Sequence, residues 1–112
     1  MHSIFKRQQE FQANFFDIEN MSMADKTKWT KEFVLCLHQE LAELMNSLDW
    51  KTYHHYSTEY TAEHTQEEII DCFKFLLNLM IIWGITADTL PDMFHAKSQQ
   101  VEDRFKHYHD NA

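Results

Sequence analysis

Residues 65–83 read TQEEIIDCFKFLLNLMIIW, and this stretch decides the fold. From position 69 to position 83 it is hydrophobic with four exceptions: Asp71, Cys72, Lys74 and Asn78. A helix that is apolar on all sides is normally buried on all sides, so we expect these residues to form a central helix. Asp71, Lys74 and Asn78 fall at i, i+3 and i+7 and form one polar stripe along it. A buried carboxylate needs compensation, so Asp71 requires a metal ion, a lysine or a ligand beside it.

A second pair of acidic residues precedes this stretch. Glu40 and Glu43 are three residues apart in a predicted helix over residues 30–48, as Glu68 and Asp71 are in the central helix. Four converging carboxylates form a site for a hard cation, Mg²⁺ or Mn²⁺. Ordinary solvated helix faces are the alternative explanation of such pairs. Because Asp71 lies in a run with almost no solvent-exposed face, and because both pairs are spaced three apart beside apolar stripes, we favour the metal site.

The composition predicts a single all-α domain over residues 1–112. One Gly and one Pro leave little turn chemistry for a β fold, so we expect a helical bundle of four main helices. The expected helices cover residues 3–20, residues 30–48, residues 65–83 and a segment from Pro91 to about His107. Asp25 or Thr27 is the expected N-cap of the second helix. Thr65 and Glu68 fit a capping box for the third, and Gly84 is its expected C-cap.

Charge and hydropathy exclude several classes of partner. The net charge of -8 argues against a nucleic acid polymer, because neutralising phosphates requires a basic surface. The longest apolar run is interrupted by Asn78 and stops near Ile85, so no membrane partner is expected. Cys36 and Cys72 lie in apolar helical sequence with no C-x-x-C motif, which predicts reduced thiols and a cytoplasmic protein.

Other metal and phosphate sites fit the sequence poorly. A di-iron bundle needs Glu-x-x-His, which the chain lacks, and no Cys/His cluster has zinc-ligand spacing. A single Gly cannot build a phosphate-binding loop, so a phosphate chain would be held by metal and by basic side chains. The candidates for this role are Lys51, Lys74, Lys97 and Arg104. For Lys74, a structural ion pair with Asp71 remains an equal alternative.

Aromatic and imidazole side chains follow the first acidic pair. Trp50 could close the core or stack on a nucleotide base. His54 and His55 lie in a long polar segment, where one of them could reach a phosphate. Gln8 and Gln12 share one face of the first predicted helix at i, i+4.

The two acidic pairs carry a resemblance to a known family. Gln39-Glu40-Leu41-Ala42-Glu43, followed at a distance by Glu68-Ile69-Ile70-Asp71, resembles the paired motif of the all-α nucleotide pyrophosphohydrolases. That superfamily includes MazG and the dimeric dUTPases, and the dUTPase-like branch often found in phages is the more similar. The further matches to this branch are Trp50-Lys51, Lys97 with Arg104, and Gln8. The resemblance covers residues 4–108.

The resemblance implies magnesium-dependent hydrolysis of a deoxynucleoside triphosphate, with dUTP the leading substrate, to the monophosphate and pyrophosphate. It implies that Glu40, Glu43, Glu68 and Asp71 hold Mg²⁺ (or Mn²⁺) and orient the attacking water. Trp50 would flank the base, and Lys51, Lys97 and Arg104 would bind phosphates. The further substrate-binding candidates are Gln8, His54, Lys74 and Asn78.

The sequence also departs from the family pattern. MazG proteins have Glu where this chain has Gln39, and the dUTPase branch commonly has His where Lys74 stands. Val101 and Phe105 replace an Asn and a Gln of the dimeric dUTPases. Because these positions lie near the sugar and phosphates in the family, they bear on the choice of nucleotide. The alternatives are therefore a pyrophosphohydrolase for another or non-standard dNTP, or a non-catalytic helical module that binds a nucleotide or a protein.

An oligomer follows from the amount of apolar surface. Three other helices cannot cover a central apolar helix and still bury their own apolar faces. The hydrophobic residues that would remain exposed include Phe15, Phe16, Ile81, Ile82, Trp83 and Phe94. We expect a symmetric partner to cover them, as a homodimer or homotetramer with residues 65–83 near the interface.

Overall fold

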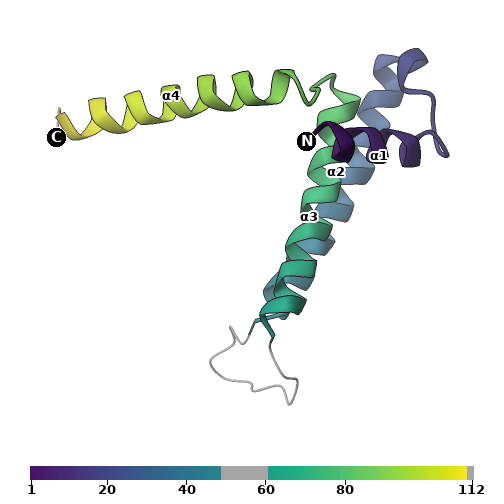
Figure 1. Ribbon diagram of the computed structural model, residues 1–112, viewed down its shortest axis with the longest axis horizontal. Coiled ribbons are helices and arrows are strands. Elements are labelled where there is room, and N and C mark those ends of the chain that lie inside the picture. The colour runs from purple at the N-terminus through teal and green to yellow at the C-terminus, as the bar shows by residue number, and fades with distance from the viewer. Residues whose placement is uncertain (49–60, 111–112) are drawn as a thin grey trace.

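The computed structural model describes residues 1–48 and 61–110, which contain helices and no β-strand. The elements are α1 (His2–Gln12), the 3-10 helix η1 (Ile18–Asn20), α2 (Met23–Asn46), α3 (Ala62–Ile82) and α4 (Thr89–Asp110). α2 and α3 lie side by side and antiparallel, α1 crosses α3 near its end, and α4 projects away from all three (Figure 1). The predicted all-α class with four main helices is confirmed, but α4 does not join the other helices in a bundle within one chain.

The first helix is shorter than predicted. It ends at Gln12 rather than near Asn20, and the chain turns before η1. Asp17 caps η1, because its carboxylate accepts hydrogen bonds from the Glu19 backbone N at 3.2 Å and from Asn20 Nδ2 at 2.6 Å. Short polar side chains that bond to nearby backbone in this way compete with helix continuation.

The second helix starts earlier than predicted, at Met23 rather than near Thr30. Ser22 is the N-cap, with its Oγ accepting from the Asp25 backbone N at 3.1 Å. Asp25 Oδ2 in turn accepts from the Ser22 backbone N at 3.3 Å, which completes a capping box. Asp25 therefore lies at the third helical position, and neither it nor Thr27 is the N-cap.

The third helix also starts earlier, and this frees an acidic side chain. Thr61 is the N-cap, with its Oγ1 accepting from the His64 backbone N at 3.2 Å, so the predicted Thr65–Glu68 capping box was wrong. Glu68 lies inside the helix, and its carboxylate is available to face α2. α3 ends one residue earlier than predicted, because Trp83 rather than Gly84 is the C-cap, and Gly84 follows directly with a φ of 80°. Pro91 lies in the first turn of α4, as predicted.

The core lies where α1 crosses α3. Phe5 of α1 packs with Leu77 and Ile81 of α3, and with Ala87 before α4. A row of aromatic rings extends this packing to α2: the ring centroids are 4.9 Å apart for Phe16–Trp29, 5.6 Å for Trp29–Phe33 and 6.2 Å for Phe33–Phe75. These contacts fix the spacing of α1, α2 and α3 relative to one another.

The central helix is not buried on all sides in a single chain, which corrects the prediction. Ile70 is 54% exposed, Ile69 49% and Trp83 47%. The reason is geometric: α1 covers only one end of α3 and α4 leaves the body, so α2 is the main cover of the remainder (Figure 1). None of the helices in the described ranges is long and apolar enough to cross a membrane.

Candidate active site

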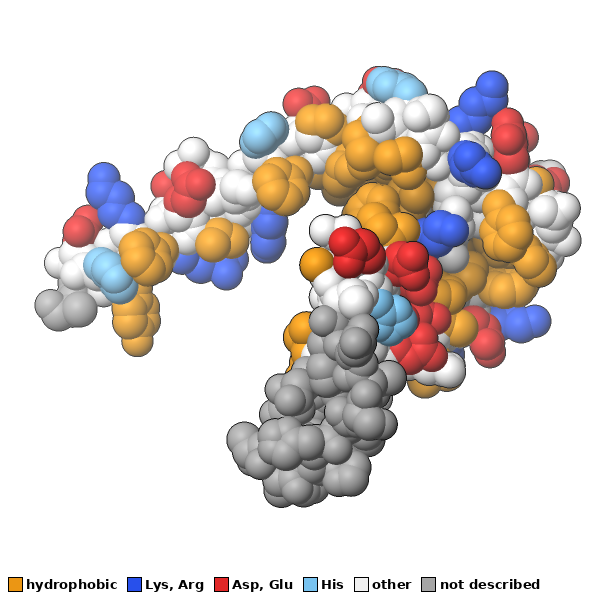
Figure 2. All heavy atoms as spheres, turned by 60° about the horizontal axis from the view of Figure 1, so that its bottom comes forward, with side chains coloured by type: hydrophobic (Ala, Val, Ile, Leu, Met, Phe, Trp, Pro, Cys, Tyr) orange, Lys and Arg blue, Asp and Glu red, His pale blue; other side chains and the backbone are white. Residues whose placement is uncertain are grey.

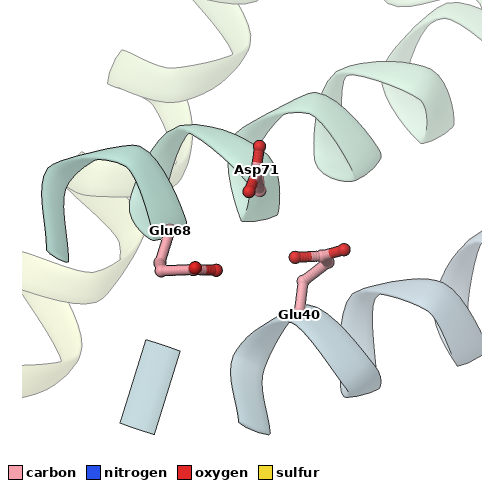
Figure 3. A group of neighbouring side chains, drawn as sticks. All are labelled: Glu40, Glu68 and Asp71. Carbon is pink, nitrogen blue, oxygen red and sulfur yellow. The ribbon is translucent and has the colours of Figure 1, made fainter. Parts of the chain in front are cut away.

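Three carboxylates converge between α2 and α3. Glu40 comes from α2, whereas Glu68 and Asp71 come from consecutive turns of α3 (Figure 3). One oxygen of each lies within 4.8 Å of the others. Residues three apart on a helix share a face, so the antiparallel pairing brings Glu40 of the first predicted pair beside both members of the second pair.

The electrostatics of this cluster are unfavourable without a cation. Burial raises the pKa of Glu40, and the charges of Glu43, Asp71 and Glu68 raise it further. Within the described ranges, Glu40 Oε2 and Glu68 Oε2 are buried and have no hydrogen-bond partner. Leaving a buried acceptor unpaired is costly, so these oxygens need a positive partner. A divalent cation that prefers oxygen ligands, such as Mg²⁺ or Mn²⁺, fits this donor set.

The fourth predicted ligand lies at the edge of the cluster. Glu43 is exposed and does not belong to the group of converging oxygens. Its charge nevertheless contributes to the raised pKa of Glu40. His64 Nε2, which the sequence analysis did not single out, lies 3.7 Å from Glu68 Oε1. Its position four residues before Glu68 on the same helix was the available signal.

A cavity of ≈ 450 Å³ adjoins the carboxylates. Its lining comes from three helices: Arg7, Gln8 and Phe11 of α1, Glu40 of α2, and Asp71, Lys74, Phe75 and Asn78 of α3. This volume lies in the usual range for small-molecule sites. The structure therefore brings the predicted Gln8, Lys74 and Asn78 together with two of the carboxylates. It adds Arg7, Phe11 and Phe75, whose only sequence signals were their positions beside or one turn from the predicted Gln8 and Lys74.

Lys74 is not the structural partner of Asp71. Its side chain is exposed, and among the ion pairs of the described residues none joins it to Asp71. The alternative of an Asp71–Lys74 ion pair is therefore wrong. Lys74 and Arg7 are instead two cationic side chains on the wall of the cavity.

Three side-chain amides connect α1 with α3 at this cavity. Gln8 Nε2 donates to Asn78 Oδ1 at 2.7 Å, and Gln12 Nε2 donates to the same oxygen at 2.9 Å. Gln12 Nε2 also lies 3.3 Å from the Asn78 backbone oxygen, and Gln12 is only 2% exposed. The predicted common face of Gln8 and Gln12 thus meets the polar stripe of α3.

Other predicted residues are not brought to this place. Trp50, Lys51, His54 and His55 lie outside the residues that the structure describes. Lys97 and Arg104 are exposed on α4, which projects away from the cavity within one chain. Figure 2 shows the same separation: acidic side chains gather over one end of the α2–α3 pair, whereas Lys and Arg side chains of α4 lie along the extended arm.

The fold and the cavity define the class: an all-α protein in which carboxylates from two antiparallel helices face a cavity of ligand size. The family model for dUTPase matches residues 1–111, and the chain belongs to this family. The resemblance drawn from the two acidic motifs is confirmed, and the chain is an enzyme of the dUTPase-like pyrophosphohydrolase type. No curated protein and no solved structure matched the chain.

Proposed function

We propose that the chain is a magnesium-dependent pyrophosphohydrolase that converts dUTP to dUMP and pyrophosphate. The observation that carries this proposal is the cluster of Glu40, Glu68 and Asp71, with two buried unpaired oxygens, beside a cavity in a chain of the dUTPase family. Mn²⁺ has the same preference for oxygen ligands and would substitute for Mg²⁺.

The carboxylates would hold the cation and the attacking water. Glu40, Glu68 and Asp71 are the ligands in this proposal, and the bound ion would neutralise phosphate charge and polarise the water. Glu43 lies beside Glu40 with an exposed side chain, so it can accept the proton that the water releases. Arg7 and Lys74 line the same cavity and would contact the phosphates.

The end of the cavity that is lined by the Gln8 and Asn78 amides would hold the nucleoside. Gln8 and Asn78 line the cavity together with the Phe11 and Phe75 rings, which offer flat apolar surfaces to a base. Asp71 and Asn78 are two turns apart on α3, or about 10 Å along its axis, so phosphate and base would occupy opposite ends. Trp50 as a second base contact, and Lys51 and His54 as phosphate contacts, remain part of the proposal.

Pyrophosphate release measured across dUTP, dCTP, dTTP, dATP and dGTP tests this function. With Mg²⁺ we expect turnover that is fastest with dUTP, and with excess chelator we expect none. Faster turnover of another nucleotide would make that nucleotide, rather than dUTP, the assigned substrate. Absence of turnover with every nucleotide, but retained binding, would favour a non-catalytic nucleotide-binding module.

We also propose a homodimer or higher oligomer, supported by apolar residues at seven-residue intervals on three helices. Each of these residues is 37% to 77% exposed in the single chain: Val34 and Leu41 on α2 with Leu48 just beyond its end, Ile69 and Leu76 on α3 with Trp83 at its C-cap, and Phe94, Val101 and Tyr108 on α4. Stripes of this spacing pack against other helices. A second copy would cover them, and its α4 could bring Lys97 and Arg104 to the cavity. Light scattering tests the oligomeric state. A stable 13.6 kDa monomer that is fully active in the pyrophosphate assay would rule out the oligomer.

A cytoplasmic location is the remaining part of the proposal. Cys36 and Cys72 are both free thiols, which suits a reducing compartment. Cell fractionation with an antibody against the chain tests it, and recovery in an oxidising compartment would contradict it.

A further inference from the structure

We propose that Gln12, which does not line this cavity but contacts Asn78 in its wall, fixes the hydrogen-bonding polarity of the end of the cavity that would hold the base and thereby selects uracil over cytosine. The inference rests on the proposed hydrolysis of a deoxynucleoside triphosphate in this cavity. It adds a positioning residue to that site, because Gln12 is buried at 2% exposure and acts on the ligand only through Asn78.

The orientation of the Gln12 amide is determined by the backbone carbonyl of Asn78. The Asn78 backbone oxygen can only accept a hydrogen bond, and Gln12 Nε2 lies 3.3 Å from it. The same nitrogen lies 2.9 Å from Asn78 Oδ1. If the Gln12 amide were turned over, its oxygen would face two oxygens of Asn78 at these distances. Gln12 must therefore direct its NH₂ group towards Asn78.

This orientation leaves an unpaired atom. Gln12 Oε1 is buried and has no hydrogen-bond partner among the described residues. A buried unpaired acceptor is unfavourable and rare in folded proteins. It persists here because the reversed amide would bring three oxygens together. The two contacts with Asn78 therefore hold Gln12 in place, and Gln12 in turn holds Asn78.

The fixed amide of Asn78 determines what the cavity offers a ligand. Asn78 Oδ1 accepts from Gln12 Nε2 and also from Gln8 Nε2 at 2.7 Å, so its lone pairs are used. Asn78 can then offer only its NH₂ group, and Gln8 offers its Oε1. Neither of these two groups forms another hydrogen bond within the described part of the chain. Both residues line the cavity, which thus presents a donor beside an acceptor.

A donor beside an acceptor complements a ring edge on which a carbonyl adjoins an N–H group. Uracil and thymine have this edge at positions 3 and 4. Cytosine has the reverse at the same positions, an unprotonated ring nitrogen and an amino group. If cytosine were held in the same place, its amino group would face the Asn78 NH₂ group and its unprotonated ring nitrogen would face Gln8 Oε1. Sites that pair with polar ligand groups reject such mismatches strongly, because buried groups are left unpaired.

The test compares dUTP with dCTP in Gln12→Leu, which removes the NH₂ group and lets Asn78 turn. We expect the ratio of kcat/KM for dUTP to that for dCTP to fall about tenfold or more, mainly through KM, because the carboxylates are untouched. Gln12→Glu replaces the donor by a carboxylate that attracts the Asn78 NH₂ group, so the ratio should fall at least as far. Gln9→Leu is the matched control, since Gln9 is the exposed neighbour on α1, and it should leave the ratio unchanged.

Calorimetric binding of dUMP and dCMP separates this inference from the proposed function. Tighter binding of dUMP by the wild-type chain, lost in Gln12→Leu, supports the role of Gln12 even if no triphosphate is hydrolysed. An unchanged dUTP-to-dCTP ratio in Gln12→Leu with wild-type helical signal overturns it, even if hydrolysis occurs. Gln12→Met, which keeps the side-chain length, takes the place of Gln12→Leu if the latter does not fold. Equal wild-type affinity for dUMP and dCMP overturns the inference without any variant.

Discussion

Glu40 on α2 and Glu68 on α3 face each other with carboxylate oxygens within 4.8 Å, and each retains one buried oxygen without a hydrogen-bond partner. These residues are far apart in the sequence and meet only because α2 and α3 pair antiparallel. Two anionic groups at this distance repel each other in a partly buried place. Much of the behaviour expected of the chain follows from how this repulsion is relieved.

Removal of one carboxylate should abolish turnover without unfolding the chain. In Glu40→Gln or Asp71→Asn we expect a loss of about 10³-fold or more in kcat, since the shape is kept but a proposed metal ligand is lost. Without metal, each variant should melt above the wild type, because repulsion within the cluster decreases. Pyrophosphate release and circular dichroism measure the two effects. Glu32→Gln, an exposed carboxylate on the same helix, is the control. Near wild-type rates in either site variant would refute the assignment.

Magnesium should stabilise the folded chain by linkage. A ligand that binds only the folded state at 100 times its Kd adds about 2.7 kcal/mol, which corresponds to a rise of roughly 10 °C or more in Tm for a domain of this size. Thermal melts with and without Mg²⁺ measure the shift. Glu40→Gln should lose most of it, and Glu32→Gln should keep it. An equal rise in Tm for the wild type, Glu40→Gln and Glu32→Gln would show that the ion binds at another place.

The stability of the metal-free chain should fall as pH rises through the titration of Glu40. Its pKa is raised above the ordinary value of 4.5, so the folded state binds the proton more tightly than the unfolded state does. The contribution of this group is therefore present below pH 4.5 and is lost as pH rises through its raised pKa. Melts across this range in chelator, compared with Glu40→Gln, isolate the effect. A variant with the same pH dependence as the wild type would show that Glu40 is not responsible.

The acidic site was predictable from the sequence because the spacing of carboxylates on a helix is a local property. Glu40, Glu68 and Asp71 needed only the helical period and two apolar faces to be placed together. The helix starts were less predictable, because Thr61 and Thr65 both precede helical sequence as possible caps. The choice of Thr61 determines that Glu68 is free for the site. Short-range signals of equal strength do not decide between such alternatives.

The polar contacts of α1 could not be predicted, because they depend on the crossing of α1 and α3. Gln8 and Gln12 share a face, but nothing in the sequence indicates that both would donate to Asn78. The exposure of Lys74 was also missed, because its helix was expected to be covered on every side. A helix that is apolar all round predicts burial on every side, and the other helices of this chain supply only part of that cover.

Nucleotide binding should change tryptophan fluorescence if Trp50 contacts the base. Trp50→Ala should raise KM several-fold, with a smaller effect on kcat, because base contact contributes to binding rather than to chemistry. The fluorescence change should persist in Trp29→Phe and Trp83→Phe. Trp29 lies in the aromatic row of the core, and Trp83 donates to Thr30 Oγ1 at 2.9 Å, so both report on packing. A signal that disappears only in Trp83→Phe would instead indicate rearrangement of the core.

Mixing of two inactive variants tests whether α4 acts on a neighbouring copy. Arg104 belongs to α4, which projects away from the other helices of its own chain (Figure 1). If it serves the cavity of a neighbouring copy, Arg104→Ala and Asp71→Asn should each reduce activity severely. If Arg104 serves the partner's cavity, a mixed dimer contains one site with an intact Asp71 and an intact Arg104. Random exchange of subunits in a two-fold dimer would then restore about a quarter of wild-type activity.

The outcome of mixing depends only on which chain supplies Arg104. If Arg104 acted within its own chain, both sites of the mixed dimer would lack one residue, and mixing would restore nothing. Asp71→Asn mixed with Glu40→Gln is the control, because Asp71 and Glu40 meet within one chain and no mixed dimer has a complete site. Pyrophosphate release before and after subunit exchange measures the recovery. Recovery in the control as well would show that the carboxylate cluster is itself assembled between chains.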